Sequence, residues 1–95
     1  MSSLNLEKSL EFTRLVEEER ARQETLWGPQ VHTAPEWVLI LAEEFGEVAK
    51  ACCKGWWTKD RPLTQMMTEL VHVAAVAEGA YADLMSQQEG ISDER

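Results

Sequence analysis

The chain has 95 residues, of which 44% are hydrophobic, and carries 9 basic against 17 acidic residues for a net charge of -8. A chain of this length forms one domain with a modest core, and its acidic balance argues against a protein that binds duplex nucleic acid, because such a surface must be basic. No stretch reaches the roughly 20 apolar residues of a membrane span, and the N-terminus lacks the basic and then apolar pattern of a signal peptide. We therefore expect a cytoplasmic protein that does not associate with membranes.

The first segment with helical periodicity runs from about Asn5 to about Leu26. Asn5 is a candidate N-cap, so we expect residues 1–4 to be frayed. Gly28 and Pro29 predict the end of this helix, because glycine adopts the left-handed conformation of a helix end and proline cannot continue the helix.

The second half of this helix is charged, with the sequence E-E-E-R-A-R-Q-E, yet one stripe continues through it. Val16, Arg20, Gln23 and Trp27 follow one another at steps of four, three and four. The stripe is either a solvated face or a face on which Arg20 and Gln23 point into a site.

A capping box, T-A-P-E, predicts the start of the central helix, because Thr33 and Glu36 can each accept a hydrogen bond from the other's backbone N–H. The helix itself is expected from Trp37 to Lys54 and should end at Gly55. Its apolar residues recur at the spacing of one helical face: Trp37, Leu41, Phe45, Val48 and Cys52.

Three carboxylates, Glu43, Glu44 and Glu47, interrupt the central helix. Residues three or four apart are neighbours on a helix, so these like charges repel, and beside an apolar face they also lose hydration. A cation such as Mg²⁺ or Mn²⁺ relieves both costs, because it binds oxygen ligands.

The third helix is expected from about Leu63 to about Gln88, followed by a frayed end over residues 88–95. Its middle is apolar nearly all round and rich in small residues, which allow the close approach of another helix. Two further helices cannot cover such a helix completely, so we expect at least a dimer, in which the bundle and a partner subunit together bury the face around Val73, Ala77 and Ala80. The fold class predicted is all-α, with three main helices per chain in a bundle completed by oligomerisation.

Before this third helix, the connector G-W-W-T-K-D-R-P carries paired tryptophans, Trp56 and Trp57, and a candidate cap, Asp60. The tryptophans either pack over the bundle end or a partner subunit, or provide a stacking surface for a nucleobase.

Glu69 and His72 are the polar side chains at the start of the apolar middle of the third helix, three residues apart. If the second and third helices form an antiparallel hairpin, residues at one level have numbers that add to about 116. Glu47 pairs with Glu69 on this basis, and Glu44 pairs with His72. Helical bundles build metal sites from such facing pairs, although a charged groove with one hydrogen-bonded histidine is the alternative.

The motifs E-E-F-G-E and, some twenty residues later, E-L-V-H-V-A-A-V-A resemble those of the all-α nucleotide pyrophosphohydrolases, the MazG-like family. The upstream stretch E-R-A-R-Q-E-T-L-W-G-P-Q-V-H resembles a small MazG-like subgroup of bacteria and their phages. The resemblance covers roughly residues 16–81, and it implies a single MazG-like domain over residues 1–95. The family pattern is E-x-x-E, a spacer and then E-x-x-D, so His72 stands where the pattern has aspartate.

The resemblance implies a helical homodimer or tetramer that cleaves a nucleoside triphosphate to the monophosphate and pyrophosphate with Mg²⁺, or with Mn²⁺. Carried over by position, the metal ligands are Glu44, Glu47, Glu69 and His72. The candidate catalytic residues are Glu43, Glu44, Glu47 and Glu69, with Glu43 able to orient or deprotonate the attacking water. The candidate substrate-binding residues are Arg20, Lys50, Lys54 and Trp27, with Lys59 as a further cation.

Two other classes of function remain open at this point. One is a non-catalytic MazG-like binding module, similar to an antitoxin subunit, that has lost its fourth metal ligand. The other is a redox or storage bundle, which the lack of a histidine in the second helix disfavours. Imidazole is a poorer ligand for Mg²⁺ than carboxylate, so His72 favours Mn²⁺ or Zn²⁺.

Overall fold

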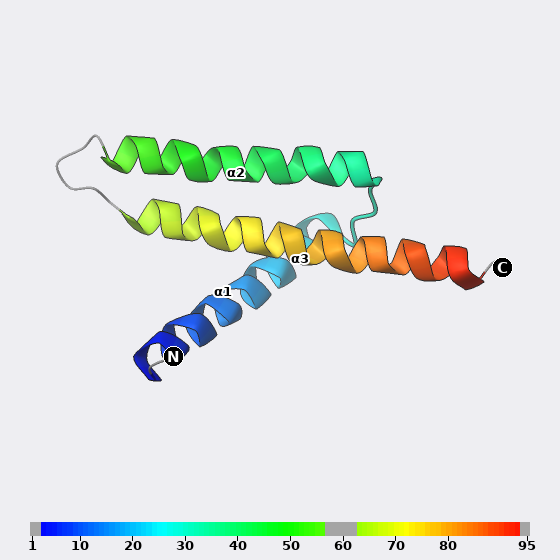
Figure 1. Cartoon of the computed structure of the whole chain (residues 1–95), viewed down its shortest axis with the longest axis horizontal. Coiled ribbons are helices and arrows are strands. Elements are labelled where there is room, and N and C mark those ends of the chain that lie inside the picture. The colour runs from blue at the N-terminus through cyan, green and yellow to red at the C-terminus, as the bar shows by residue number, and fades with distance from the viewer. Residues whose placement is uncertain (1–2, 57–62, 94–95) are drawn as a thin grey trace.

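The computed structural model describes residues 3–56 and 63–93, which form three helices and contain no strand (Figure 1). The helices are α1 (Ser3–Trp27), α2 (Ala34–Trp56) and α3 (Leu63–Asp93). The all-α prediction is therefore confirmed. None of these three helices combines the length and the hydropathy that a bilayer crossing requires.

α2 and α3 run side by side in opposite directions, as the antiparallel hairpin predicted from the sequence (Figure 1). Their contact contains the core of the chain, in which Trp37 packs with Val76 and Ala80. The surrounding, partly buried side chains are Ile40, Leu41 and Leu84. Ala80, from the face predicted to be buried, is thus covered within the hairpin, where its small side chain lets α2 approach α3 closely.

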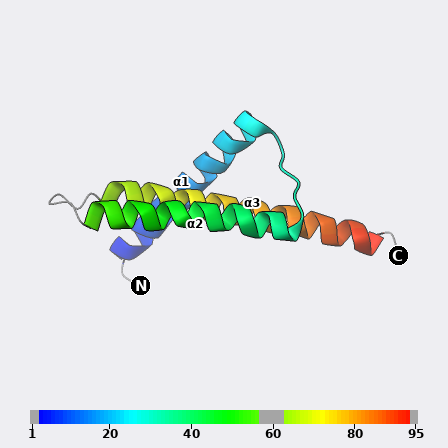
Figure 2. The same ribbon diagram turned by 90° about the horizontal axis from the view of Figure 1, so that it is seen from above.

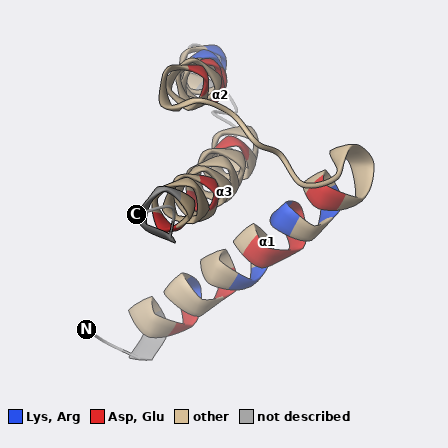
Figure 3. Cartoon of the chain, turned by 90° about the vertical axis from the view of Figure 1, so that its right-hand side faces the viewer, with Lys and Arg blue, Asp and Glu red and all other residues tan. Residues whose placement is uncertain are grey.

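α1 crosses α3 obliquely and packs against it rather than against α2 (Figures 2 and 3). Val16 is the buried apolar residue of α1, and it lies at the middle of the helix. The N-terminal half of α1 leaves Leu6 and Leu10 largely exposed. α3 is consequently the central element, in contact with both other helices.

The loop from α1 to α2 has the local structure that its residues predict. Gly28 has a φ of 70°, and its N–H donates to the carbonyl of Glu24 at 2.7 Å, which closes the end of α1. The capping box also forms, since Thr33 N–H donates to Glu36 Oε1 at 2.8 Å and Glu36 N–H donates to Thr33 Oγ1 at 3.3 Å.

Three predicted helix ends differ from the structure. Asn5 is not an N-cap, because α1 already begins at Ser3. α2 continues through Gly55 to Trp56, and α3 continues to Asp93, five residues beyond Gln88. Glycine and polar residues weaken a helix without forbidding it, so composition alone placed the ends of α2 and α3 too early and the start of α1 too late. The predicted roles of Trp57, Lys59 and Asp60 lie outside the described residues.

The predicted apolar face of α2 is divided between two sides of the helix. Trp37 and Val48 are buried, whereas Phe45 is 65% exposed and Cys52 is exposed. The steps of four residues to Phe45 and to Cys52 turn these side chains away from the surface that α3 covers, whereas the step of three to Val48 turns back toward it. Phe45 and Cys52 therefore lie outside the buried face of α2 in the single chain.

Candidate functional site

Glu44 of α2 and Glu69 and His72 of α3 form a cluster in which one ligand atom from each residue lies within 4.8 Å of the others. Each of the three side chains is partly buried. The antiparallel register brings Glu44 to the level of His72, because the two helices run in opposite directions from their connector. The helical spacing of three adds Glu69 on the same face of α3.

Within this cluster, His72 Nδ1 lies 3.3 Å from Glu69 Oε2. The other oxygen of Glu69, Oε1, accepts a hydrogen bond from Gln65 Nε2 at 2.8 Å, one helical turn earlier. Gln65 thus orients the carboxylate so that its second oxygen faces the imidazole.

The electrostatics of the cluster are unfavourable to a further negative charge. Burial raises the pKa of Glu44 above its ordinary value, and the negative charges of Glu69, Glu47 and Glu19 raise this pKa further, while His72 opposes them. A bound cation would stabilise the charged form of such a carboxylate.

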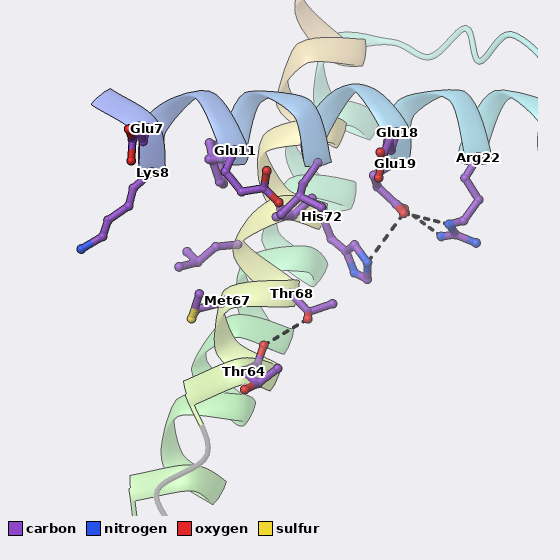
Figure 4. Close-up of a pocket in the computed structure, with 14 residues that line it drawn as sticks. Glu7, Lys8, Glu11, Glu18, Glu19, Arg22, Thr64, Met67, Thr68 and His72 are labelled. Carbon is purple, nitrogen blue, oxygen red and sulfur yellow. Dashed lines mark hydrogen bonds and ion pairs between the residues drawn. The ribbon is translucent and has the colours of Figure 1, made fainter. Parts of the chain in front are cut away.

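Glu19 of α1 is a member of this environment that the sequence did not identify. Its Oε1 lies 3.8 Å from His72 Nε2, and its side chain is only 10% exposed (Figure 4). Arg22 donates to both oxygens at 2.8 and 2.7 Å, and these hydrogen bonds hold the pKa of Glu19 below its ordinary value. Glu19 could not be distinguished from the other acids of the run E-E-E-R-A-R-Q-E by composition. The signal that could have identified it is its spacing of three and four from Arg22 and Gln23.

The other predicted acids lie at the margin of the cluster. Glu47 is exposed and does not belong to the group of three, although its charge contributes to the raised pKa of Glu44. Glu43, one residue before Glu44, is also exposed. Because consecutive helical residues point about 100° apart, Glu43 and Glu44 cannot both face α3.

The predicted substrate-binding residues divide into two groups. Arg20 Nη1 pairs with Glu78 Oε1 at 2.8 Å, which ties α1 to α3, and Trp27 lies 61% exposed with the Arg22 guanidinium 5.9 Å from its ring centre. Lys50 and Lys54 are exposed on α2 and have no part in the cluster of Glu44, Glu69 and His72.

The cluster opens into a groove of about 1040 Å³ between the second half of α1, the loop and the hairpin. Glu44, His72 and Glu19 line one part of it, and Arg20, Gln23 and Trp27 line another. The groove therefore joins carboxylate and imidazole ligands to arginine and aromatic side chains.

Two carboxylates and an imidazole within reach of one another fit a divalent cation, since these are the donor types that Mg²⁺, Mn²⁺ and Zn²⁺ bind in proteins. The raised pKa of Glu44 agrees with this fit, because a bound cation offsets both the burial of its carboxylate and the repulsion from neighbouring acids. The imidazole ligand shifts the metal preference of this site from Mg²⁺ toward Mn²⁺ or Zn²⁺.

No protein-family model matches the chain, and neither the curated proteins nor the solved structures contain a match. The resemblance to MazG-like proteins therefore rests on the sequence motifs alone.

Proposed function

We propose that this protein is a metal-dependent nucleoside triphosphate pyrophosphohydrolase, a hydrolase with a MazG-like domain. The proposal takes its reaction from the motif resemblance. The observation that carries it is the meeting of Glu44, Glu69 and His72 at one level of the hairpin, beside a groove lined by arginine and tryptophan. A triphosphate needs a divalent cation against its phosphates and cationic and aromatic groups beside them, and this groove offers both.

Glu44, Glu69 and His72 are the residues that would hold the metal, and Glu47 is a further, exposed acid on α2 that the motif resemblance adds to them. When bound, Mg²⁺ or Mn²⁺ neutralises phosphate charge and lowers the pKa of a bound water. Glu47 and Glu43 are exposed carboxylates on the same turns of α2, where a rotamer change can bring one of them to a water molecule as a base.

The nucleotide would lie in the groove, with its phosphates toward Glu44 and its nucleoside toward Trp27. Arg20 is held in place by Glu78 and can contact a phosphate oxygen, while the ring of Trp27 offers a stacking face. Lys50 and Lys54 lie on α2 outside this groove, so we assign them a role only in an assembly of two or more chains. The reaction would take place in the cytoplasm.

His72 favours a second candidate function, a MazG-like module that binds metal or nucleotide without hydrolysing it. The imidazole stands where the family pattern has its fourth acid, and it brings no negative charge to the metal. Metal or nucleotide binding without product release is the result expected for this module.

The test is incubation of the pure protein with the common ribo- and deoxyribonucleoside triphosphates in Mg²⁺ or Mn²⁺, with separate assays for pyrophosphate and orthophosphate. We expect pyrophosphate and a monophosphate from at least one substrate. Glu69→Gln should reduce the rate by about 100-fold or more, because even groups that only orient a metal ligand are worth about 10- to 100-fold. Glu89→Gln, an exposed change on the same helix, is the matched control.

Orthophosphate as the sole inorganic product would contradict the proposal, as would equal rates for Glu69→Gln and Glu89→Gln. Binding of a nucleotide with no product at all would favour the non-catalytic module.

A further inference from the structure

Glu19 is held in one orientation by its own helix. Arg22 donates to both of its oxygens, and Gln23 Nε2 donates to Oε2 at 2.7 Å. These donors lie three and four residues along α1, on the same face as Glu19. The carboxylate is thus fixed and partly neutralised before it meets any group of another helix, and a carboxylate so occupied is a poor metal ligand.

Across the contact of α1 with α3, the ring of His72 faces Glu19 (Figure 4), and its other nitrogen faces Glu69 of α3. Nε2 lies 3.8 Å from Glu19 Oε1, and Nδ1 lies 3.3 Å from Glu69 Oε2. A neutral imidazole carries its proton on only one nitrogen, and only the other nitrogen has a lone pair for a metal. The two carboxylates therefore compete to decide which nitrogen becomes the ligand.

We infer that Glu19 is the positioning residue of His72. It accepts the N–H of Nε2 and so directs the lone pair of Nδ1 to the side of Glu69 and Glu44. A movement of less than 1 Å brings the 3.8 Å separation to hydrogen-bond length. Histidines that bind metals commonly donate their other ring N–H to a carboxylate, which fixes the tautomer and raises the basicity of the ligand.

The inference rests on the proposed metal centre and adds a helix to it. Glu44 and Glu69 come from the hairpin, whereas Glu19 comes from α1, which packs only on α3 among the described helices. Metal binding should therefore strengthen the docking of α1, and α1 carries Arg20, Arg22 and Trp27, which line the groove.

The experiment compares Glu19→Gln with Glu17→Gln in the full chain. Both variants lose one negative charge on α1, but Glu17 is exposed and does not line the groove. By calorimetric titration with Mn²⁺, we expect Glu19→Gln to bind about 10- to 100-fold more weakly than the parent, and Glu17→Gln to bind as the parent does.

A readout of the ring itself separates positioning from a merely structural role. In ¹⁵N spectra of the parent loaded with diamagnetic Zn²⁺, we expect the His72 proton on Nε2 and the metal on Nδ1. Glu19→Gln should lose this single tautomer even where circular dichroism shows unchanged helices. A loss of folding stability alone would not move the ¹⁵N signals in this way.

A proton on Nδ1 in the loaded parent would overturn the inference without any variant, and so would unchanged Mn²⁺ affinity in Glu19→Gln. A parent that binds no divalent metal would overturn both the inference and the metal centre. A parent that binds metal with the Nε2–H tautomer but releases no pyrophosphate would overturn the hydrolase and leave the role of Glu19 in place.

Discussion

Glu44, Glu69 and His72 occupy a small volume in which each side chain disturbs the others. Gln65 orients Glu69, and His72 lies between Glu69 and Glu19, whereas no hydrogen bond from the described residues orients Glu44. Its pKa is raised first by burial and then by neighbouring negative charges. Replacements in this cluster should therefore have opposite effects in the absence and in the presence of metal.

Glu44→Gln should abolish the rise in melting temperature that Mn²⁺ gives the parent, because it removes a ligand. Without metal, the variant should also remove a pH dependence of the folding stability. A carboxyl whose pKa is raised in the folded state contributes its full stability below its ordinary pKa of 4.5, and this contribution is lost as pH rises through the raised pKa. Relative to Glu44→Gln, the metal-free parent should therefore lose stability as pH rises above about 4.5. Thermal melts from pH 4 to 8 test this, and a parent that gains stability over the variant in that range would contradict it.

His72→Asp restores the fourth acid of the family pattern. Without metal, the new carboxylate faces Glu69, Glu44 and Glu19, so the melting temperature should fall. With Mg²⁺ the shift in melting temperature should exceed that of the parent, because carboxylate is the better ligand for this ion. His72→Asn, which removes the imidazole without adding charge, is the control and should show no such gain.

At the scale of the elements, Asp83 of α3 ties the loop and the start of α2 to the third helix. Its Oδ2 accepts from the backbone N–H of His32 at 2.9 Å, from Trp37 Nε1 at 2.8 Å and from Gln87 Nε2 at 3.0 Å. His32 also packs edge-on against Trp37, with ring centres 4.8 Å apart. His32 therefore anchors the loop beside the groove.

Asp83→Asn should lower the melting temperature, because the amide group cannot accept three donors as a carboxylate does. The His32 N–H holds the pKa of Asp83 below its ordinary value of 3.8, with help from Trp37 and Gln87. A lowered pKa gives stability above the ordinary value, and this stability is lost as pH falls through the folded-state pKa. The difference in melting temperature between the parent and Asp83→Asn should thus be largest at pH 7 and should decrease below pH 3.8.

Glu89→Gln, an exposed change on the same helix, should follow the parent at every pH. If the difference in melting temperature between the parent and Asp83→Asn increased in acid, the Asp83 carboxylate would not be the source of this stability.

The molecule as a whole is elongated, and it exposes more surface than a compact monomer of its mass. It measures 58 × 32 × 25 Å with a radius of gyration of 16.2 Å, whereas a compact chain of this length has about 12 Å. It exposes 7464 Å², against about 5,500 Å² for a typical monomer of its mass. Part of the excess is an exposed stripe on α2 at heptad-like steps: Val38, Ala42, Phe45 and Ala49. This stripe is the surface that a second helix pair can cover.

We predict that the protein is at least a dimer at micromolar concentration and that Phe45→Glu shifts it to monomer, because a buried unpaired carboxylate is costly. Light scattering after size exclusion measures this. Leu39→Glu is the matched control, since Leu39 is equally exposed on α2, at 65%, but lies on the face of Glu43 and Lys50. A monomeric parent, or equal effects of the two variants, would contradict the prediction.

The sequence by itself determined those features that depend on local spacing. The capping box at Thr33, the glycine end at Gly28 and the antiparallel pairing of Glu44 with His72 all follow from steps of three and four along a helix and from the position of the connector. The path of α1 could not be obtained in this way, because nothing in its charged second half indicates which helix it crosses, or at what angle. Only the tertiary structure decided that Glu19 is buried beside His72, that Phe45 leaves the hairpin contact, and that Asp83 anchors the loop, since each depends on side chains that are distant in the chain.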